Sequence, residues 1–364
     1  MTQLNSKIIT THFLQDIAND VALEYSLTCN WSTWHIWDYY KCFQSSRISL
    51  YPEETPIFQE TAPFATCVDL AFAIVVDIRC KLASTPGLEK YVESVQTIAC
   101  YTGSLPFHCC AAIVLPSECI VIDIGLHYEA FIVPLHSHFD TMPYLNMRGN
   151  ASFNRFRYMP SSNGAPTLSI QDSPNTGDPL QVMHFAEIGY SSAVDQINFR
   201  LARETKDSAA GDHKRVPSAK YLTITSKLLD VRYTTIPSLY IPSIGGSLAT
   251  TCRLKVDFGQ GTITMQIPVV DWLLKSENSS LHTEVLNSGL FYPVSDAVAN
   301  LKLDLACQRE ISERIVLVGK IGERIGLPMK EYFRIIASVL DHIPCRKDTS
   351  SNLMLALDHS LLAH

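Results

Sequence analysis

Apolar residues in the first hundred positions recur with helical spacing in two segments. In residues 11–27 they fall at every fourth position, which predicts an amphipathic opening helix: Phe13, Ile17, Val21 and Tyr25. The second segment starts at Thr66 and runs to about Leu82. It is apolar on almost every face, so we expect a helix that is buried near the centre of the fold.

Three continuous apolar runs follow, at residues 107–115, 119–124 and 130–135. Their length and their content of β-branched residues predict buried strands. A tight turn centred on Ser117 and Glu118 would join the first two strands as a hairpin. In that register Asp123 would lie opposite Ala112.

The last third of the chain combines further β-structure with two closing helices. Residues 221–233 are expected to be extended, and residues 253–258 and 262–267 flank a glycine-containing turn typical of a hairpin. Residues 301–325 and 328–343 are predicted to be helices, the first ending near Gly326 and the second starting at Pro328.

Residues 150–219 are rich in Ser, Pro, Asn, Gly and Asp and show little periodicity. We interpret this segment as a lid-like insertion, because so long a connection is unusual in a compact domain. The predicted organisation is a helical lobe over residues 1–105, an antiparallel β domain over residues 106–300 containing that insertion, and C-terminal helices over residues 301–364. The fold class is therefore expected to be α+β, with a helical lobe, an antiparallel β-barrel or sheet, and terminal helices.

Composition narrows the range of functions. A formal net charge of −7 without a basic stripe argues against a nucleic-acid partner. No apolar run approaches the roughly 20 residues that cross a bilayer, and the N-terminus lacks a signal-peptide pattern. Eleven cysteines, several inside apolar runs, indicate reduced thiols in a cytoplasmic protein.

The start of the central helix holds the most informative motif, Thr66–Cys67–Val68–Asp69. Thr66 is a favourable N-cap, and Asp69 occupies the position that can close a capping box. Cys67 then falls in the first helical turn, where exposed N–H groups and the helix dipole favour a thiolate. It is a candidate nucleophile, although a small buried core residue is an equal alternative from this motif alone.

Two polar residues interrupt the apolar strands. His108 stands at the mouth of the first strand, where it could act as a general base for a thiol. Asp123 lies near the end of the second, and a buried carboxylate needs a partner. We expect Asp123 to orient His108, which requires strand curvature, a bulge or another register if Asp123 is opposite Ala112.

The order and spacing of Cys67, His108 and Asp123 resemble those of arylamine N-acetyltransferases, within the papain-like and transglutaminase-like cysteine enzymes. The segment at 121–125 followed by the strand at 131–135 is similar to that family's V-D-V-G segment and next strand. The resemblance implies a Cys–His–Asp triad that transfers an acyl group through a thioester. It also implies an acyl-CoA or acyl-carrier thioester as co-substrate, a small-molecule acceptor, and a place in biosynthesis, including amide bond or ring formation.

The resemblance covers residues 56–135, about a fifth of the chain, and the chain departs from the family in two places. The family's Arg-Gly-Gly-x-Cys approach is replaced by Pro-Phe-Ala-Thr-Cys, and its second glycine after the aspartate by Leu126 and His127. The departures leave the acyl donor and acceptor open. No tightly bound cofactor is expected.

Other functions remain open at this point. The same triad would serve a thiol hydrolase or amidase, and a non-catalytic ligand-binding protein would use the fold without the chemistry. A metal-dependent enzyme is a further alternative, because His136 and His138 have the His-x-His spacing of metal ligands, with His127, Asp140 and His184 as possible additions.

Overall fold

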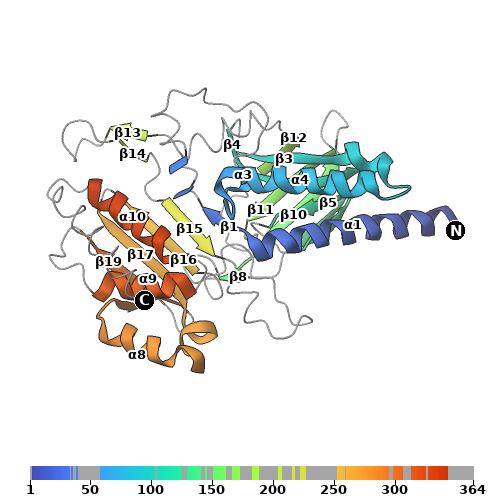
Figure 1. Cartoon of the computed structure of the whole chain (residues 1–364). Helices are drawn as coiled ribbons and strands as arrows, with labels where there is room; N and C mark the ends of the chain where they lie inside the picture. The colour runs from blue at the N-terminus through green and yellow to red at the C-terminus, as the bar shows by residue number, and fades with distance from the viewer. Residues whose placement is uncertain are drawn as a thin grey trace. The chain divides into compact units, whose positions relative to one another are not determined.

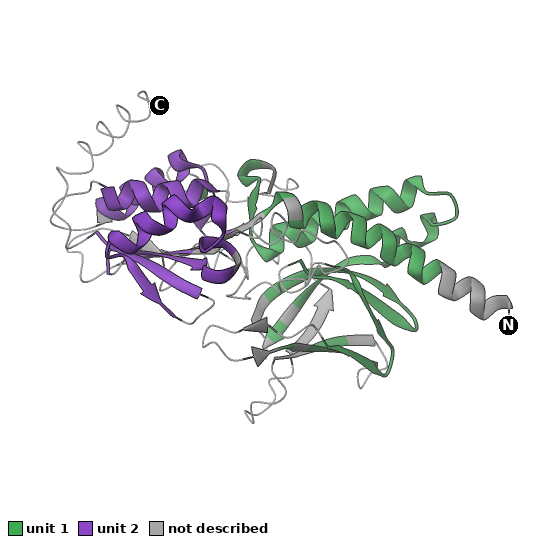
Figure 2. Cartoon of the chain, turned by 90° about the horizontal axis from the view of Figure 1, so that it is seen from below, with its two compact units in different colours: residues 1–31, 39–200, 234–247 green, residues 32–38, 201–233, 248–364 purple. Residues whose placement is uncertain are grey.

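The computed structural model describes residues 2–32, 34–35, 38–39, 58–102, 105–124, 129–140, 144–145, 151–160, 166–172, 183–187, 204–206, 215–217, 222–226, 252–258, 260–294, 298–305, 313–324 and 327–342. The chain divides into two compact units (Figure 2). Unit 1 comprises residues 1–31, 39–200 and 234–247, and unit 2 comprises residues 32–38, 201–233 and 248–364. The polypeptide therefore passes between the units several times.

Unit 1 is built on a seven-stranded sheet with the order β10-β11-β12-β3-β4-β5-β6. Its strands are β3 (Val95–Thr102), β4 (Leu105–Leu115), β5 (Glu118–Ile122), β6 (Phe131–Pro134), β10 (Asn154–Pro160), β11 (Pro166–Asp172) and β12 (Met183–Glu187). All the paired strands of this sheet run antiparallel. The three apolar runs predicted as strands correspond to β4, β5 and β6.

Two helices, α1 (Thr2–Thr28) and α4 (Cys67–Ser84), pack on one face of this sheet (Figure 1). The central helix predicted from Thr66 onward is confirmed, and the opening helix is longer than residues 11–27. Their apolar side chains meet alternate residues of β4 and β5 in one core that includes Leu14, Ile74, Ala111, Ile113 and Ile122. This layer holds the first turn of α4 over the sheet.

A second core lies on the other face of the sheet, because Cys110 and Ala112 of β4 and Cys119 and Val121 of β5 alternate with the residues that face the helices. It contains Cys110, Ala112, Val121, Phe156 and Tyr158. The strands curl towards one another around this core. An isolated bridge joins Leu135, just after β6, to Tyr158 in β10.

Part of the segment predicted as a lid belongs to this sheet. Strands β10, β11 and β12 lie within residues 150–219, and β12 pairs with β3 through Phe185 and Cys100. The sequence of β10 explains why this segment forms a strand: buried Phe156 and Tyr158 alternate with Arg155 and Arg157. This period of two is a strand pattern that the polar composition around it obscured.

Shorter elements complete unit 1. They are the parallel pair β1 (Asn30–Ser32) and β2 (Phe64–Ala65), the short helix α3 (Phe58–Thr61), the 3-10 turn η1 (Glu89–Ser94), and the two-stranded pair β8 (Tyr144–Leu145) and β9 (Ala151–Ser152). The peptide bond between Ala62 and Pro63, just before β2, is cis.

Unit 2 contains an antiparallel sheet in the order β18-β19-β17-β16-β15. The strands are β15 (Leu222–Ser226), β16 (Cys252–Asp257), β17 (Thr262–Pro268), β18 (Phe291–Pro293) and β19 (Val298–Asp304). Its helical elements are η4 (Val269–Leu273), η5 (Ser276–Asn278), α8 (Ser279–Asn287), α9 (Glu313–Arg324) and α10 (Met329–His342), and a separate pair joins β13 (Glu204–Lys206) to β14 (Arg215–Pro217). The hairpin predicted at residues 253–258 and 262–267 is confirmed as β16 and β17.

The predicted helix at residues 301–325 is wrong in its first part. Leu301 and Leu303 are buried while Lys302 is exposed, so these residues alternate as a strand does and complete β19 against β17. The helix starts only at Glu313. The second predicted helix, at residues 328–343, is confirmed as α10.

The described parts of the chain thus combine helices with antiparallel sheets, in agreement with an α+β class. Among these described residues, no helix has both the length and the apolar content that crossing a membrane requires.

Candidate active site

Cys67 is the first residue of α4, as its sequence context predicts. Thr66 precedes it as N-cap with extended backbone angles (φ −89°, ψ 177°), and its carbonyl accepts the first helical hydrogen bond from the N–H of Leu70. Cys67 is half-buried, whereas Thr66 and Val68 on either side are fully buried. The thiol therefore lies on a fixed helix end and keeps access to solvent.

The capping box expected from Thr66 and Asp69 is not formed by the threonine side chain. Thr66 Oγ1 makes no cap hydrogen bond and instead donates to Asp69 Oδ2 at 2.7 Å. Asp69 is completely buried. The pair joins the residue before Cys67 to the third residue of the helix, which fixes the first turn.

His108 and Asp123 are in direct contact. His108 Nε2 lies 2.6 Å from Asp123 Oδ2, and the two side chains are 19% and 2% exposed. The expected position of Asp123 opposite Ala112 is wrong, because Leu115 pairs with Glu118 across a two-residue turn and Ala112 pairs with Val121. This register moves Asp123 two residues closer to His108 than the sequence suggested.

The β-bulge predicted as one solution also occurs, on the other side of β4. The pairing of β3 with β4 shifts between Cys100 and Tyr101, so that Cys100 pairs with His108 and Tyr101 with Pro106. A bulge twists the strand locally and redirects side chains. It lies directly beside His108.

The charges around His108 favour its protonated form. Burial alone would lower the pKa of His108, but the Asp123 carboxylate, the hydrogen bond to it and the nearby Cys67 thiol together raise this pKa well above its ordinary value. Because Nε2 faces Asp123, Nδ1 is the ring nitrogen left for the Cys67 thiol. The structure thus brings His108 and Asp123 into contact and places Cys67 near His108.

The sequence did not indicate that one further residue, Cys109, belongs to this site. Cys109, next to His108 in β4, has its pKa raised well above the usual value by burial and by the nearby charges of Cys67, Asp123 and Asp69. It is 2% exposed and therefore a core residue. The sequence shows only that Cys109 is next to His108. The charges around its thiol come from residues that only the tertiary fold brings near.

The histidines considered as metal ligands gain no further ligand from the fold. His136 occupies a turn with φ 65°, not a strand, and both His136 and His138 are exposed. Asp140 is paired with Arg155 at 2.5–2.6 Å, and His127 lies outside the described residues. Within the part of the chain that the structure describes, no group of three or more His, Cys, Asp and Glu could hold a metal ion.

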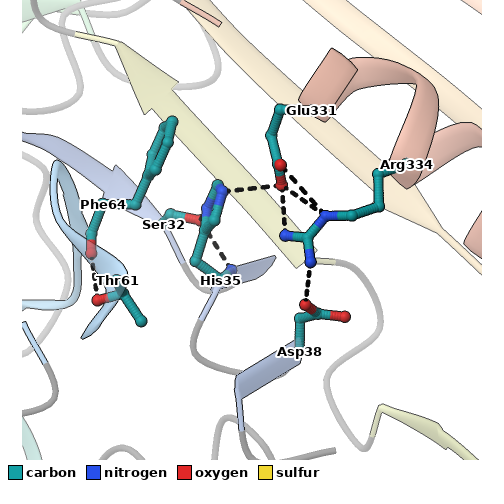
Figure 3. A network of polar contacts seen from close by, with 7 residues as sticks. All are labelled: Ser32, His35, Asp38, Thr61, Phe64, Glu331 and Arg334. Atoms are coloured by element: carbon teal, nitrogen blue, oxygen red, sulfur yellow. Dashed lines mark hydrogen bonds and ion pairs between the residues drawn. The ribbon is translucent and has the colours of Figure 1, made fainter. Parts of the chain in front are cut away.

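Unit 2 has a separate polar network that resembles a triad only in composition (Figure 3). Ser32 Oγ lies 2.6 Å from His35 Nδ1, and His35 Nε2 lies 3.0 Å from Glu331 Oε1. Arg334 bridges Glu331 and Asp38. Ser32 is completely buried and His35 is 8% exposed, so a substrate cannot reach the hydroxyl, and we interpret the network as a structural link between residues 32–38 and α10.

The pKa values in this network follow from burial and pairing. Burial would raise the pKa of Glu331, but hydrogen bonds from His35 and Arg334 and their charges lower it to about 2. Burial lowers the pKa of His35, against the opposing effect of Glu331. The carboxylate is therefore ionised and held by both His35 and Arg334.

Comparisons of the chain with protein-family models, with curated proteins and with solved structures give no match.

Proposed function

We propose that unit 1 is a cysteine-dependent acyl-transfer enzyme that acts on a small molecule through a thioester on Cys67. The observation that carries the proposal is the 2.6 Å contact between His108 and Asp123, with Cys67, at the first turn of α4, close enough to raise the pKa of His108. A thiol, an imidazole and a carboxylate in this order form the arrangement of an activated nucleophile.

In the first half-reaction the Cys67 thiolate attacks the acyl carbonyl carbon. The bond to the leaving group breaks, and the imidazolium of His108 gives its proton to that group. The raised pKa of His108 supports this step, because it keeps the imidazolium populated near neutral pH. Asp123 holds the ring through Nε2 and stabilises its positive charge.

In the second half-reaction neutral His108 removes a proton from the acceptor, which attacks the thioester and restores the thiolate. The backbone N–H of Cys67 belongs to the first helical turn, where N–H groups lack partners within the helix, and is therefore a candidate oxyanion donor. Water as acceptor gives hydrolysis, and an amine gives N-acylation. The identity of the acceptor therefore decides whether the enzyme acts as a transferase or as a hydrolase or amidase.

The first test is brief alkylation with substoichiometric iodoacetamide at neutral pH, followed by peptide mapping. Cys80 is a matched internal comparator, because it lies on the same helix and is exposed, whereas Cys67 is half-buried. An activated thiolate is expected to react first despite its lower exposure. His108→Ala should slow labelling of Cys67 and leave Cys80 unchanged, while preferential labelling of Cys80 in the natural sequence would reject Cys67 as the nucleophile.

The second test uses para-nitrophenyl acetate and acetyl-CoA as acyl donors, with intact-protein mass spectrometry. An acetyl adduct on Cys67, absent in Cys67→Ser, is expected with at least one donor. Adding aniline should speed the loss of the adduct if the enzyme is a transferase, and should not change it if the enzyme is a hydrolase. A folded protein that never forms the adduct would instead favour a non-catalytic binding protein.

A further inference from the structure

An open cavity of about 730 Å³ lies on one face of the unit 2 sheet. Residues of β16, β17, β18 and β19 line it, and the residues alternating with them on the opposite face form a core that includes Val256, Ile263 and Leu303. Its volume is in the range of small-molecule sites, about 300–1,000 Å³. Nothing in the acyl-transfer proposal uses this cavity.

Charged residues line the cavity in two rows that cross the strands. In one row Lys255 pairs with Thr264, which pairs with Lys302. In the other, Asp257 pairs with Thr262, which pairs with Asp304. The rows are two residues apart along each strand, which corresponds to about 7 Å.

This arrangement differs from that of an ordinary solvated sheet face. Such a face is stabilised by opposite charges placed across neighbouring strands. Here each row has a single sign, with a threonine between the two charges, so positive and negative potential are separated along the strand direction. Lys255, Asp257, Thr264 and Asp304 are all only partly exposed, which strengthens the local field.

Two further residues shape the cavity. Arg314, at the start of α9, adds a third cation to the lining. It lies against Gly289, because a Cβ added to that glycine would be 3.7 Å from the Arg314 guanidinium. Tyr292 of the edge strand β18 pairs with Asn300 of β19 and is 67% exposed, so an aromatic ring is available at the cavity. Asp257 is fixed by accepting a hydrogen bond from the N–H of Gln260 at 3.0 Å.

We propose that this cavity binds a small zwitterion, with its carboxylate at the lysine row and its ammonium group at the aspartate row. Thr264 and Thr262 supply a hydroxyl to each row. A molecule with both charges several ångströms apart matches the sign of both rows, whereas a simple anion or cation matches one and is repelled by the other. The site is independent of Cys67 and does not depend on the acyl-transfer reaction.

The test is isothermal titration calorimetry on the full chain with three probes of matched length. These are ε-aminocaproate with both charges, caproate with the negative charge alone, and hexylamine with the positive charge alone. We expect ε-aminocaproate to bind at least about tenfold more tightly than either single-charge probe. Equal affinity of ε-aminocaproate and caproate, or no saturable binding of ε-aminocaproate at millimolar concentration, would overturn the proposal.

Two variants assign the ends of the probe. Lys302→Gln should weaken ε-aminocaproate about tenfold without weakening hexylamine, and Asp304→Asn should weaken ε-aminocaproate without weakening caproate. Both residues lie on the cavity side of β19, so neither change opens the core, and thermal unfolding verifies that the variants fold. Lys330→Gln, at an exposed position of α10, is the charge-matched control and should change nothing. Affinity that is indifferent to both cavity substitutions would place the binding elsewhere and reject the site.

Discussion

At His108, burial and pairing act in opposite directions on the same imidazole. Burial penalises the charged ring, yet Asp123 and Cys67 overcome that penalty and raise its pKa. The carboxylate is 2% exposed, so little solvent screens the interaction. The protonation state of His108 is therefore a property of the pair, and Asp123 is the residue that controls it.

Replacing Asp123 with Asn should lower the pKa of His108, because the amide carries no charge and burial then dominates. An NMR titration of the His108 ring signals checks this directly. Acyl transfer should also fall, on the order of 10²-fold or more. Asp20→Asn, at an exposed position of α1 in the same unit, is the control for loss of a carboxylate.

The same substitution has a consequence for stability that depends on pH. A histidine whose pKa is raised by folding stabilises the protein fully below its unfolded pKa of about 6.5 and loses this contribution as pH rises through the folded pKa. The difference in unfolding free energy between the natural sequence and Asp123→Asn should thus be greatest near pH 6, at about 1–3 kcal/mol, and shrink in alkaline solution. Urea unfolding across this pH range would detect it, and a constant difference would contradict a charged His108.

Among the secondary-structure elements, α9 and α10 show how closely two helices of unit 2 pack. A Cβ at Gly319 in α9 would lie 2.5 Å from Met329 Sδ and 3.0 Å from Tyr332 Cδ1. Tyr332 is completely buried, so its ring has little room to move. One turn further on, a Cβ at Gly322 would meet only ordinary contacts, at 3.5 Å or more.

The two glycines therefore give opposite predictions for the same change. Gly319→Ala should lower the free energy of unfolding by about 1–3 kcal/mol through overpacking. Gly322→Ala should be neutral or stabilise by up to about 1 kcal/mol through helix propensity. Thermal or urea unfolding of both variants compares them, and equal effects would exclude close packing at Gly319 as the cause.

The elements that were predicted correctly are those whose signal is local. The apolar central helix, the strands at β4 to β6 and the hairpin of β16 with β17 follow from periodicity and turn residues. Strands β10 to β12 were missed because polar loops surround short alternating runs, and because the pairing of Phe185 with Cys100 joins segments far apart in sequence. The predicted register of Asp123 was wrong because the position of the turn decides it. The two turn residues are Pro116 and Ser117, not Ser117 and Glu118, and this shift of one residue changes every pair in the hairpin.

The candidate site was accessible from the sequence for a related reason. Cys67, His108 and Asp123 each interrupt an apolar pattern at the end of an element, and a buried polar group needs a partner. The network of Ser32, His35 and Glu331 could not be predicted in this way. Its members are separated by almost the whole chain, and only the tertiary fold shows that they meet.

Across the whole molecule, a short segment near the N-terminus belongs to the unit formed mainly by the C-terminal part. Residues 32–38 cluster with unit 2 although both flanking segments belong to unit 1. Trp34 is completely buried and stacks on Phe258 with a centroid distance of 6.0 Å, and His35 is in contact with Glu331. The segment thus supplies part of the core and part of the polar network of unit 2.

A fragment of residues 201–364 should therefore fail to unfold cooperatively, because it lacks Trp34 and leaves Glu331 and Arg334 without two of their partners. The same fragment joined by a flexible linker to residues 30–40 should recover cooperative unfolding. Near-UV circular dichroism in a urea series distinguishes the two. If the shorter fragment unfolds as cooperatively as the linked one, residues 32–38 are not part of the structural unit.

Because of this arrangement, residues that interact in unit 2 are synthesised far apart in time. Arg334 reaches Asp38 across 296 positions of sequence. At the usual elongation rate of about 5–20 residues per second, Asp38 is made roughly 15–60 s before its partner. During that interval Trp34 has no completed core to enter, so the newly made N-terminal region exposes a large apolar side chain that a chaperone could hold until the last helices leave the ribosome.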